Sequence, residues 1–565
     1  PESITVLDPA CGSGHILVVA YDVLKAIYLE RGYRVRDIPR LILEKNLFGL
    51  DIDDRAAQMA GFALLMKARA DDRRLFTATD DAGNLLPPKL NVLSLQESKG
   101  LSVDELATHL APFKVQRATI SALVDTFEHA KTFGSLIQIP YALKTHLAEL
   151  PQMLAQVKQS GDMYATAAAD DLLPLVQQAQ VLAMQFDAVV ANPPYMGSKG
   201  MNPVLKDYAR TTFPDSKADL FAMFMERGFE SCKPSGFNSF VTMQSWMFLS
   251  SYESMRLKLL NERTLQTMAH LGARAFGEIS GEVVQTTAFV FQLMATNFKP
   301  SFFRLIEGEE VEKELALRNR QFLFNGTFQS DFHKVPGSPL AYWVTERSRS
   351  VYIKFNKVSD FAETRIGLIT GENQKYIRNW YEISIAEIGF NMDREGAKNS
   401  GLRWFPQSKG GDFKRWYGNN ETVVDWKNDG NEMQTRLHSS GERTLAHNFN
   451  LDKIFEPAVT WTKISSGDFA VRLQPKGFLF NDASANAFVD SDEARTAVLG
   501  YLGTKLPGEF LKALNPTLNF LPGNVSSLPV PANMLESKSV QRTVGRLVEL
   551  AKFDWDSFET SWDFK

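Results

Sequence analysis

The residues whose types and spacing are best suited to chemistry are Asn192, Pro193, Pro194 and Tyr195, which follow the apolar run 186–190. That run is typical of a buried strand, and the prolines end it because each fixes φ and removes a backbone donor. The turn therefore lies at the carboxyl end of a strand, where open α/β sheets bind ligands. The alternative interpretation is an ordinary loop that only ends the strand.

A rigid turn of this composition can activate an aromatic exocyclic amine. Such an amine is a poor nucleophile because its lone pair is delocalised into the ring. Two acceptors that take both amine hydrogens would pull the nitrogen toward tetrahedral geometry and expose the lone pair. The Asn192 side-chain oxygen and the Pro193 carbonyl can be these acceptors, and Tyr195 offers a ring face for the base. We therefore predict a catalytic loop that needs no strong base.

A glycine-rich turn near the start of the chain is the candidate site for a second ligand. We expect a strand over residues 3–7 before this turn and a helix over 16–28 after it. This arrangement lets a backbone approach a ligand closely at a helix amino terminus. The turn has Gly12 and Gly14 but lacks the third spaced glycine of a dinucleotide fingerprint, so a nucleoside other than NAD is indicated.

An acidic residue follows the next predicted strand. That strand covers residues 46–50 and ends at Asp51, with Ile52 behind it. An acid in this position can accept hydrogen bonds from both ribose hydroxyls of a bound nucleoside. The alternative is that Asp51 only caps a helix that begins near residue 54.

The composition is that of a globular protein with several cores. The chain has 565 residues, of which 44% are hydrophobic and 23% charged, and no apolar run is long enough to span a bilayer. Its two cysteines, Cys11 and Cys232, lie far apart, which predicts a reducing cytoplasm and no structural zinc. The net charge of −4 neither supports nor excludes nucleic acid, because binding depends on a local basic face. The chain enters a strand almost at once, so we expect an amino-terminal part before Pro1.

Strand and helix patterns alternate through residues 1–300, which predicts an α/β doubly wound sheet. Residues 96–185, rich in Leu, Ala and Gln at helical spacing, are predicted to form a helical insertion. Beyond the catalytic loop we expect a helix from Asp219, a strand over 237–245 and strand material over 283–293.

Residues 301–565 have a different texture, with aromatic and basic residues interleaved among glycines, and we expect an α+β region there. Lys and Arg beside glycine-rich loops suit phosphate contacts, whereas Asn, Gln and Arg can read base edges. The candidates for DNA contact are Arg365, Asn373, Gln374, Lys375, Arg378, Lys409, Lys414, Arg415 and Lys463. The alternative is that these residues belong to ordinary solvated loops.

The order of the three motifs resembles that of the S-adenosylmethionine-dependent, amino-specific DNA methyltransferases. The resemblance implies that Asp51 and Ile52 hold the cofactor ribose and that the loop 192–195 is catalytic. It also implies that Asp219 lies against the cofactor, and that Asn91 and Val92 on a third strand replace the usual Asp at its adenine. The glycine-rich turn would hold the methionine and ribose side through Asp8, Pro9, Ala10, Cys11, Gly12 and Gly14.

The pattern over 404–419, with 515–520 and 528–531, is similar to the large methyltransferases of BREX phage-resistance systems, the PglX family, and to related fused restriction-modification enzymes. This resemblance implies a Rossmann-like class I methyltransferase domain over 1–300 and a DNA target recognition region over 301–565. It implies methylation of adenine N6 at a specific double-stranded DNA site. The implied partners are DNA, other BREX components and phage DNA-mimic inhibitors, with no membrane.

Other functions stay open from the residues alone. The same two acceptors would activate the N4 amine of cytosine or an amine of a protein or RNA. The chain could also act as a DNA-specificity subunit with little catalysis, although the intact Asp8, Asp51 and Asn192 argue against this.

Overall fold

The computed structural model describes residues 1–79, 83–276, 284–465, 467–517 and 519–564. The chain forms two compact units, Pro1–Gln329 and Ser330–Lys565. Our predicted boundary near residue 300 falls earlier than this division. The reason is that two short strands, β8 (Ser301–Arg304) and β9 (Leu323–Phe324), still pair within the sheet of the first unit.

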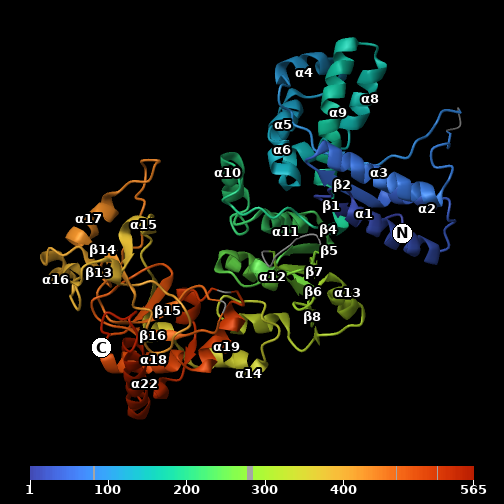
Figure 1. Ribbon diagram of the computed structural model, residues 1–565. Coiled ribbons are helices and arrows are strands. Elements are labelled where there is room, and N and C mark those ends of the chain that lie inside the picture. The colour runs from blue at the N-terminus through green and yellow to red at the C-terminus, as the bar shows by residue number, and fades with distance from the viewer. Residues whose placement is uncertain (80–82, 277–283, 466, 518, 565) are drawn as a thin grey trace. The chain divides into compact units, whose positions relative to one another are not determined.

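The first unit is built on a nine-stranded sheet with the order β3-β2-β1-β4-β5-β7-β6-β8-β9 (Figure 1). The remaining strands are β1 (Val6–Asp8), β2 (Leu47–Asp51), β3 (Asn91–Ser94), β4 (Phe186–Ala191), β5 (Cys232–Met243), β6 (Thr264–Gly272) and β7 (Thr286–Gln292). Strands β1 to β5 are all parallel, and β7 pairs antiparallel with both β5 and β6. The prediction of a doubly wound α/β sheet is therefore confirmed. The strand expected over 283–293 is β7, and residue 283 lies outside the described residues.

Helices α1 (His15–Glu30) and α3 (Asp54–Asp71) form one core with the sheet. The α1 residues Leu17, Tyr21, Leu24 and Tyr28 are fully buried because their spacing places them on one face of the helix. Gly14, just before α1, has a φ of 85°, and a Cβ there would lie 2.8 Å from the Cβ of Ala60. A side chain at this position would clash with α3, so only a glycine allows the turn to lead into α1 so close to α3.

The helical insertion lies between β3 and β4, as predicted. It comprises α4 (Val103–Leu110), α5 (Arg117–Phe127), α6 (Ala130–Phe133), α7 (Tyr141–Lys144), α8 (Leu150–Gln159) and α9 (Met163–Ala183). In Figure 1 most of these helices stand together in blue to teal next to β1 and β2. Their apolar stripes pack against one another, so they form a small core.

After the loop that follows β4 come α10 (Pro203–Thr212), α11 (Leu220–Glu230) and α12 (Glu253–Glu262). Helix α11 packs on β5, and its residues from Leu220 to Met225 are all buried. This packing fixes the segment that leaves the predicted catalytic loop.

The second unit contains two four-stranded sheets, in the orders β11-β18-β15-β16 and β12-β14-β13-β17. These strands are β11 (Glu363–Ile366), β12 (Ile377–Asn379), β13 (Trp404–Ser408), β14 (Thr422–Asp425), β15 (Ala458–Thr462), β16 (Val471–Gln474), β17 (Leu479–Phe480) and β18 (Ser484–Phe488). Helices α18 (Asp492–Leu502), α19 (Lys505–Leu514) and α22 (Lys538–Asp556) complete a mixed unit around apolar cores. The predicted α+β character is confirmed.

Within the described part of the chain, no helix is long and apolar enough to cross a membrane. The same residues contain no group of three or more side chains that could hold a metal ion.

Candidate functional site

Three motifs that are distant in sequence end at one edge of the first sheet. In the parallel register, Asp8 at the end of β1 lies beside Gly49, so the two strands run the same way and β2 ends two residues further on, at Asp51. Strand β4 is parallel to β1, with Val189 beside Leu7, and ends at Ala191 just before Asn192. The glycine-rich turn, Asp51 and the predicted catalytic loop therefore share the carboxyl edge of the sheet.

The glycine-rich turn is tied directly to Asp51. The backbone N–H of Gly12 donates to Asp51 Oδ2 at 2.8 Å, and the N–H of Asp53 donates to Oδ1 at 2.9 Å. Gly12 has a φ of +52°, and a Cβ built on it would meet no atom within 4 Å, so open space lies beside it. The side chain of Cys11, in contrast, is buried in the core, and only its backbone belongs to the turn.

Asp51 is not the cap of α3. That cap is Asp53, whose carboxylate accepts hydrogen bonds from the backbone N–H groups of Arg55 and Ala56 at 2.8 and 3.0 Å. The alternative interpretation of Asp51 as a simple helix cap is therefore wrong. Asp51 is half-buried at the carboxyl end of β2, and its carboxylate holds the turn.

Asp8 is a buried carboxylate with one hydrogen bond, accepted from the backbone N–H of Ala10 at 3.1 Å. Burial raises its pKa to about 7, the hydrogen bond from Ala10 lowers it in part, and the charge of Asp51 raises it further. Among the residues described, neither Asp8 nor Asp51 forms an ion pair with a basic side chain. Two adjacent carboxylates without a cation suit a ligand that carries positive charge, as S-adenosylmethionine does, so the residues present fit this cofactor.

The loop after β4 is held at both ends. The Tyr195 hydroxyl lies 3.1 Å from Asn192 Oδ1 and 3.2 Å from the carbonyl oxygen of Val241 on β5. Burial raises the pKa of this hydroxyl, and the charge of Asp219 adds to the effect, so Tyr195 stays neutral. Its ring meets that of Phe221 edge-on, with the centroids 6.0 Å apart. Asn192 is exposed at the edge, as a group that meets a substrate must be.

Asp219 has a structural role within the fold, and its predicted position against the cofactor stays a prediction. Its Oδ1 accepts hydrogen bonds from the backbone N–H groups of Met196 at 2.9 Å and Phe221 at 3.3 Å. Asp219 is thus the N-cap of α11 and also anchors Met196, at the end of the predicted catalytic loop. Burial raises the pKa of this carboxyl, against the hydrogen bonds that lower it.

The prediction that Asn91 and Val92 contact the cofactor does not fit the register of β3. Asn91 lies beside Phe48 at the amino end of the parallel pair, whereas Ser94 lies beside Asp51 at the ligand edge. The Asn91 amide donates to the carbonyls of Leu43 and Glu44, and Asn91 lines a cavity of about 700 Å³ away from that edge. Val92 packs against the core formed by α1 and α3.

Sequence reasoning missed the residues that the helical insertion brings to this edge. The ammonium of Lys131 contacts Asp54 and Ser94, and the Ser135 hydroxyl donates to the carbonyl of Pro9. Lys131 and Ser135 lie far from the motifs in sequence, and no pattern marks them. Only the tertiary fold identifies them.

In the second unit, most of the candidate DNA contacts are already paired within the fold. Arg365 makes two hydrogen bonds to the carboxylate of Asp452, at 2.9 and 2.8 Å, and Lys463 lies 3.2 Å from Asp482. Lys375 pairs with Glu432, and Arg378 donates to the carbonyls of Gln374 and Ile377. Each of these four side chains therefore has a hydrogen-bond partner within the fold, and their role in DNA readout stays a prediction.

The cations near the glycine pair Gly410–Gly411 are different. Lys409 and Lys414 are exposed, and neither forms an ion pair among the described side chains. Arg415 is half-buried, with its guanidinium 5.2 Å from the ring centre of Phe413. Gln374 is exposed as well, and Asn373 accepts a hydrogen bond from Thr370.

Comparison with known proteins gives a consistent result. Residues 45–276 match the family described as Eco57I restriction-modification methylase. The whole chain is 45% identical to the adenine-specific methyltransferase BrxX of Escherichia coli O9:H4 (strain HS), of which it covers 47%. It is 35% identical to the adenine-specific methyltransferase PglX of Lacticaseibacillus casei (strain Zhang), again covering 47% of that protein.

Solved structures share the fold at low sequence identity. The Type IIL restriction-modification enzyme MmeI in complex with DNA aligns with a TM-score of 0.51 at 13% identity, over 100% of this chain and 67% of that one. A nuclease-deletion mutant of the Type ISP enzyme LlaGI aligns with a TM-score of 0.52 at 12% identity, over 97% and 44%. The predicted resemblance to PglX is therefore confirmed as a similarity over the whole chain, and the chain spans about half the length of the two relatives BrxX and PglX.

Proposed function

We propose that this chain transfers a methyl group from S-adenosylmethionine to the N6 amine of adenine at a specific site in double-stranded DNA. The observation that carries the proposal is the shared sheet edge of Asp8, Asp51 and Asn192. The names of BrxX and PglX as adenine-specific methyltransferases support it. MmeI, which has the same fold, was solved in complex with DNA, and this supports DNA as the substrate.

The catalytic loop would activate the amine by accepting its hydrogens. Asn192 is exposed at the edge, and Pro193 fixes the backbone carbonyl that follows the amide side chain. Each oxygen would accept one N–H of the amine, which raises electron density at nitrogen as the new bond forms. The ring of Tyr195 would stack on a base that has left the duplex, because a paired base cannot reach this edge.

The cofactor would supply an electrophilic methyl group on a sulfonium. Asp51 would accept hydrogen bonds from the ribose hydroxyls, and the open space at Gly12 would let the turn approach the ligand closely. Asp8 would offer negative charge to the cationic end of the cofactor from a buried position. Asp219 would contribute by anchoring the catalytic loop through Met196.

The second unit would hold and read the DNA. Exposed Lys409 and Lys414 are suited to phosphates, and exposed Gln374 is suited to a base edge. Acidic phage inhibitors that mimic DNA would meet the same basic side chains, and other BREX components would be further partners. The role in the cell would be the marking of host DNA in the cytoplasm during phage defence.

Modified-base sequencing of DNA from cells that carry the intact protein tests the function. We expect N6-methyladenine at one recognised sequence, and its loss in cells that carry Asn192→Ala. N4-methylcytosine at that sequence would instead support the alternative function, methylation of cytosine N4. Unmodified DNA, from cells in which the protein is present and folded, would contradict both.

A further inference from the structure

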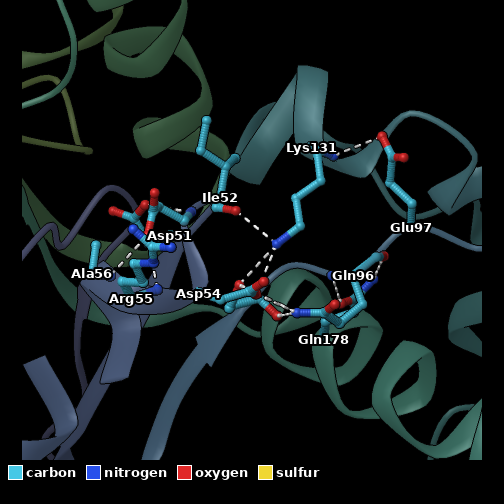
Figure 2. Close-up of polar contacts among 11 residues, drawn as sticks. Asp51, Ile52, Asp54, Arg55, Ala56, Gln96, Glu97, Lys131 and Gln178 are labelled. Atoms are coloured by element: carbon cyan, nitrogen blue, oxygen red, sulfur yellow. Dashed lines mark hydrogen bonds and ion pairs between the residues drawn. The ribbon is translucent and has the colours of Figure 1, made fainter. Parts of the chain in front are cut away.

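A lysine of the helical insertion reaches the edge of the sheet where the cofactor is proposed to bind. Lys131 lies on α6, and its ammonium donates to the carbonyl of Ile52 at 2.7 Å. The same nitrogen lies 2.9 Å from Asp54 Oδ1 and 3.0 Å from Ser94 Oγ. Figure 2 shows this side chain pointing from the insertion toward Ile52 and Asp54. An ammonium has three N–H donors, so one lysine can join the ends of β2, α3 and β3.

The acceptors of Lys131 are themselves fixed. Gln96 donates to Asp54 Oδ1 at 2.8 Å and to the carbonyl of Ser94 at 3.1 Å. The side chain of the buried Gln178 on α9 fixes the backbone of Gln96. Its Oε1 accepts from the Gln96 N–H at 2.8 Å, and its Nε2 donates to the Gln96 carbonyl at 2.9 Å. Hydrogen bonds from Ser94, Lys131 and Gln96 lower the pKa of Asp54, so its carboxylate is ionised and strengthens the contact with the ammonium. The contact therefore connects two preorganised groups.

The residues that follow Lys131 lie across the proposed cofactor turn. The Ser135 hydroxyl donates to the carbonyl of Pro9 in that turn. Gly134 has a φ of +57°, and a Cβ there would lie 3.0 Å from Ile52 Cγ2. The segment Ala130–Leu136, which comprises α6 and the 3₁₀ turn Gly134–Leu136, thus touches the residues after both β1 and β2.

The same segment also contacts the helix that follows the catalytic loop. The rings of Phe133 and Tyr208 stack with their centroids 4.1 Å apart and their planes at 15°. The Tyr208 hydroxyl, on α10, donates to the carbonyl of Leu136 at 3.0 Å. One short piece of the insertion therefore connects the cofactor edge with the region beyond Tyr195.

We infer that Lys131 is a positioning residue that clamps the segment Ala130–Leu136 over the sheet edge, and that this segment forms one wall of the cofactor site. The inference rests on the proposed function, because it assigns the wall to the proposed S-adenosylmethionine site. It gives the insertion a part in cofactor binding that the motifs do not show. Without the clamp, the segment loses the three Lys131 contacts to Ile52, Asp54 and Ser94, and the site opens on that side.

Hydrogen exchange of the protein without cofactor tests the clamp. The variant is Lys131→Met, which keeps the length of the side chain and removes the charge. The matched control is Lys158→Met, because Lys158 pairs with Asp170 at 2.7 Å in the same insertion and is 44% exposed, against 32% for Lys131. We expect exchange across 130–136 to accelerate at least tenfold in Lys131→Met and to stay unchanged in Lys158→Met. Equal exchange in the two variants would overturn the clamp.

Calorimetric titration with S-adenosylmethionine and with S-adenosylhomocysteine tests the wall. We expect the dissociation constants of Lys131→Met to rise about tenfold, those of Lys158→Met to stay within twofold, and Lys131→Arg to recover most of the affinity. An open clamp with unchanged affinity would overturn the inference and leave the proposed function intact. Failure of the unaltered protein to bind either ligand would contradict the proposed function and the wall together, while the exchange result would still decide the clamp.

Discussion

The two units use their charged side chains in different ways. At the sheet edge of Pro1–Gln329, Asp8 and Asp51 approach each other, and among the described residues no basic side chain neutralises either one. In Ser330–Lys565, cations such as Arg365 and Lys463 are matched to nearby acids. Unneutralised acids at an edge raise the free energy of the ligand-free fold, whereas matched pairs do not. The comparison teaches that a charged side chain without an oppositely charged neighbour is the better indicator of a ligand.

The largest expected effect tests whether the loop at the sheet edge of the first unit catalyses methyl transfer. Asn192→Ala should lower methyl transfer at least about a hundredfold, because it removes an acceptor that acts as the new bond forms. Cofactor and DNA affinities should stay near normal. The matched control is Asn202→Ala, because the Asn202 side chain caps α10 through the N–H of Leu205 and does not lie in the loop. Single-turnover transfer of a labelled methyl group measures both, and equal rates in the two variants would exclude the catalytic loop.

The next effect separates a ligand-binding acid from a structural one two residues away. Asp51→Ala should weaken cofactor binding by about 1 to 3 kcal/mol, because hydrogen bonds to a charged group are lost. Asp53→Ala removes the cap of α3 and should lower the free energy of unfolding by about 1 kcal/mol while sparing cofactor affinity. Titration calorimetry and urea unfolding distinguish the two. If Asp53→Ala weakened the cofactor as much as Asp51→Ala, the edge would need a different assignment.

Much of the first unit could be predicted because its motifs constrain the backbone. A glycine pair before a helix and two prolines after an apolar run specify turns, and parallel pairing then brings those turns to one edge. Asn91 was predicted at the wrong end of β3. It lies three residues before Ser94, the residue that pairs with Asp51, and apolar composition does not show which residues of two strands pair. Lys131 was missed because its partners are remote in sequence.

For the second unit, the sequence predicted the α+β fold class but not the partners of individual side chains. Basic residues among aromatics indicated nucleic acid, but composition does not show which acid each cation meets. Arg365 is 87 residues from Asp452 in sequence, and Lys375 is 57 residues from Glu432. These pairs form when strands and loops pack together, so only the tertiary fold separates Lys409 and Lys414 from the paired cations.

A smaller effect follows from the buried carboxyl of the first unit. The pKa of Asp8 is about 7 in the fold, above its model-peptide value, so the folded state keeps a proton that the unfolded state has already lost. The free energy of unfolding should therefore fall as pH rises, by about 1.4 kcal/mol between pH 6 and 8 from this group alone. Asp8→Asn cannot ionise and should lack this contribution. Urea unfolding of both proteins without cofactor at the two pH values measures the difference, and identical pH dependence would mean that Asp8 ionises normally.

The smallest effect tests the second unit, through two cations with different surroundings. Lys414→Ala should weaken DNA binding a few-fold for every sequence alike and reduce the slope of affinity against salt by about 1, as expected for one lost phosphate contact. Arg365→Ala should leave DNA affinity unchanged and lower the free energy of unfolding by under about 1 kcal/mol, because its partner is the partly exposed Asp452. Gln374→Ala, measured beside them on the preferred site and on single-base variants, should change the ratio between sites. If Arg365→Ala reduced binding as Lys414→Ala does, ion pairing within the fold would not exclude a DNA contact, and the contrast between the two units would fail.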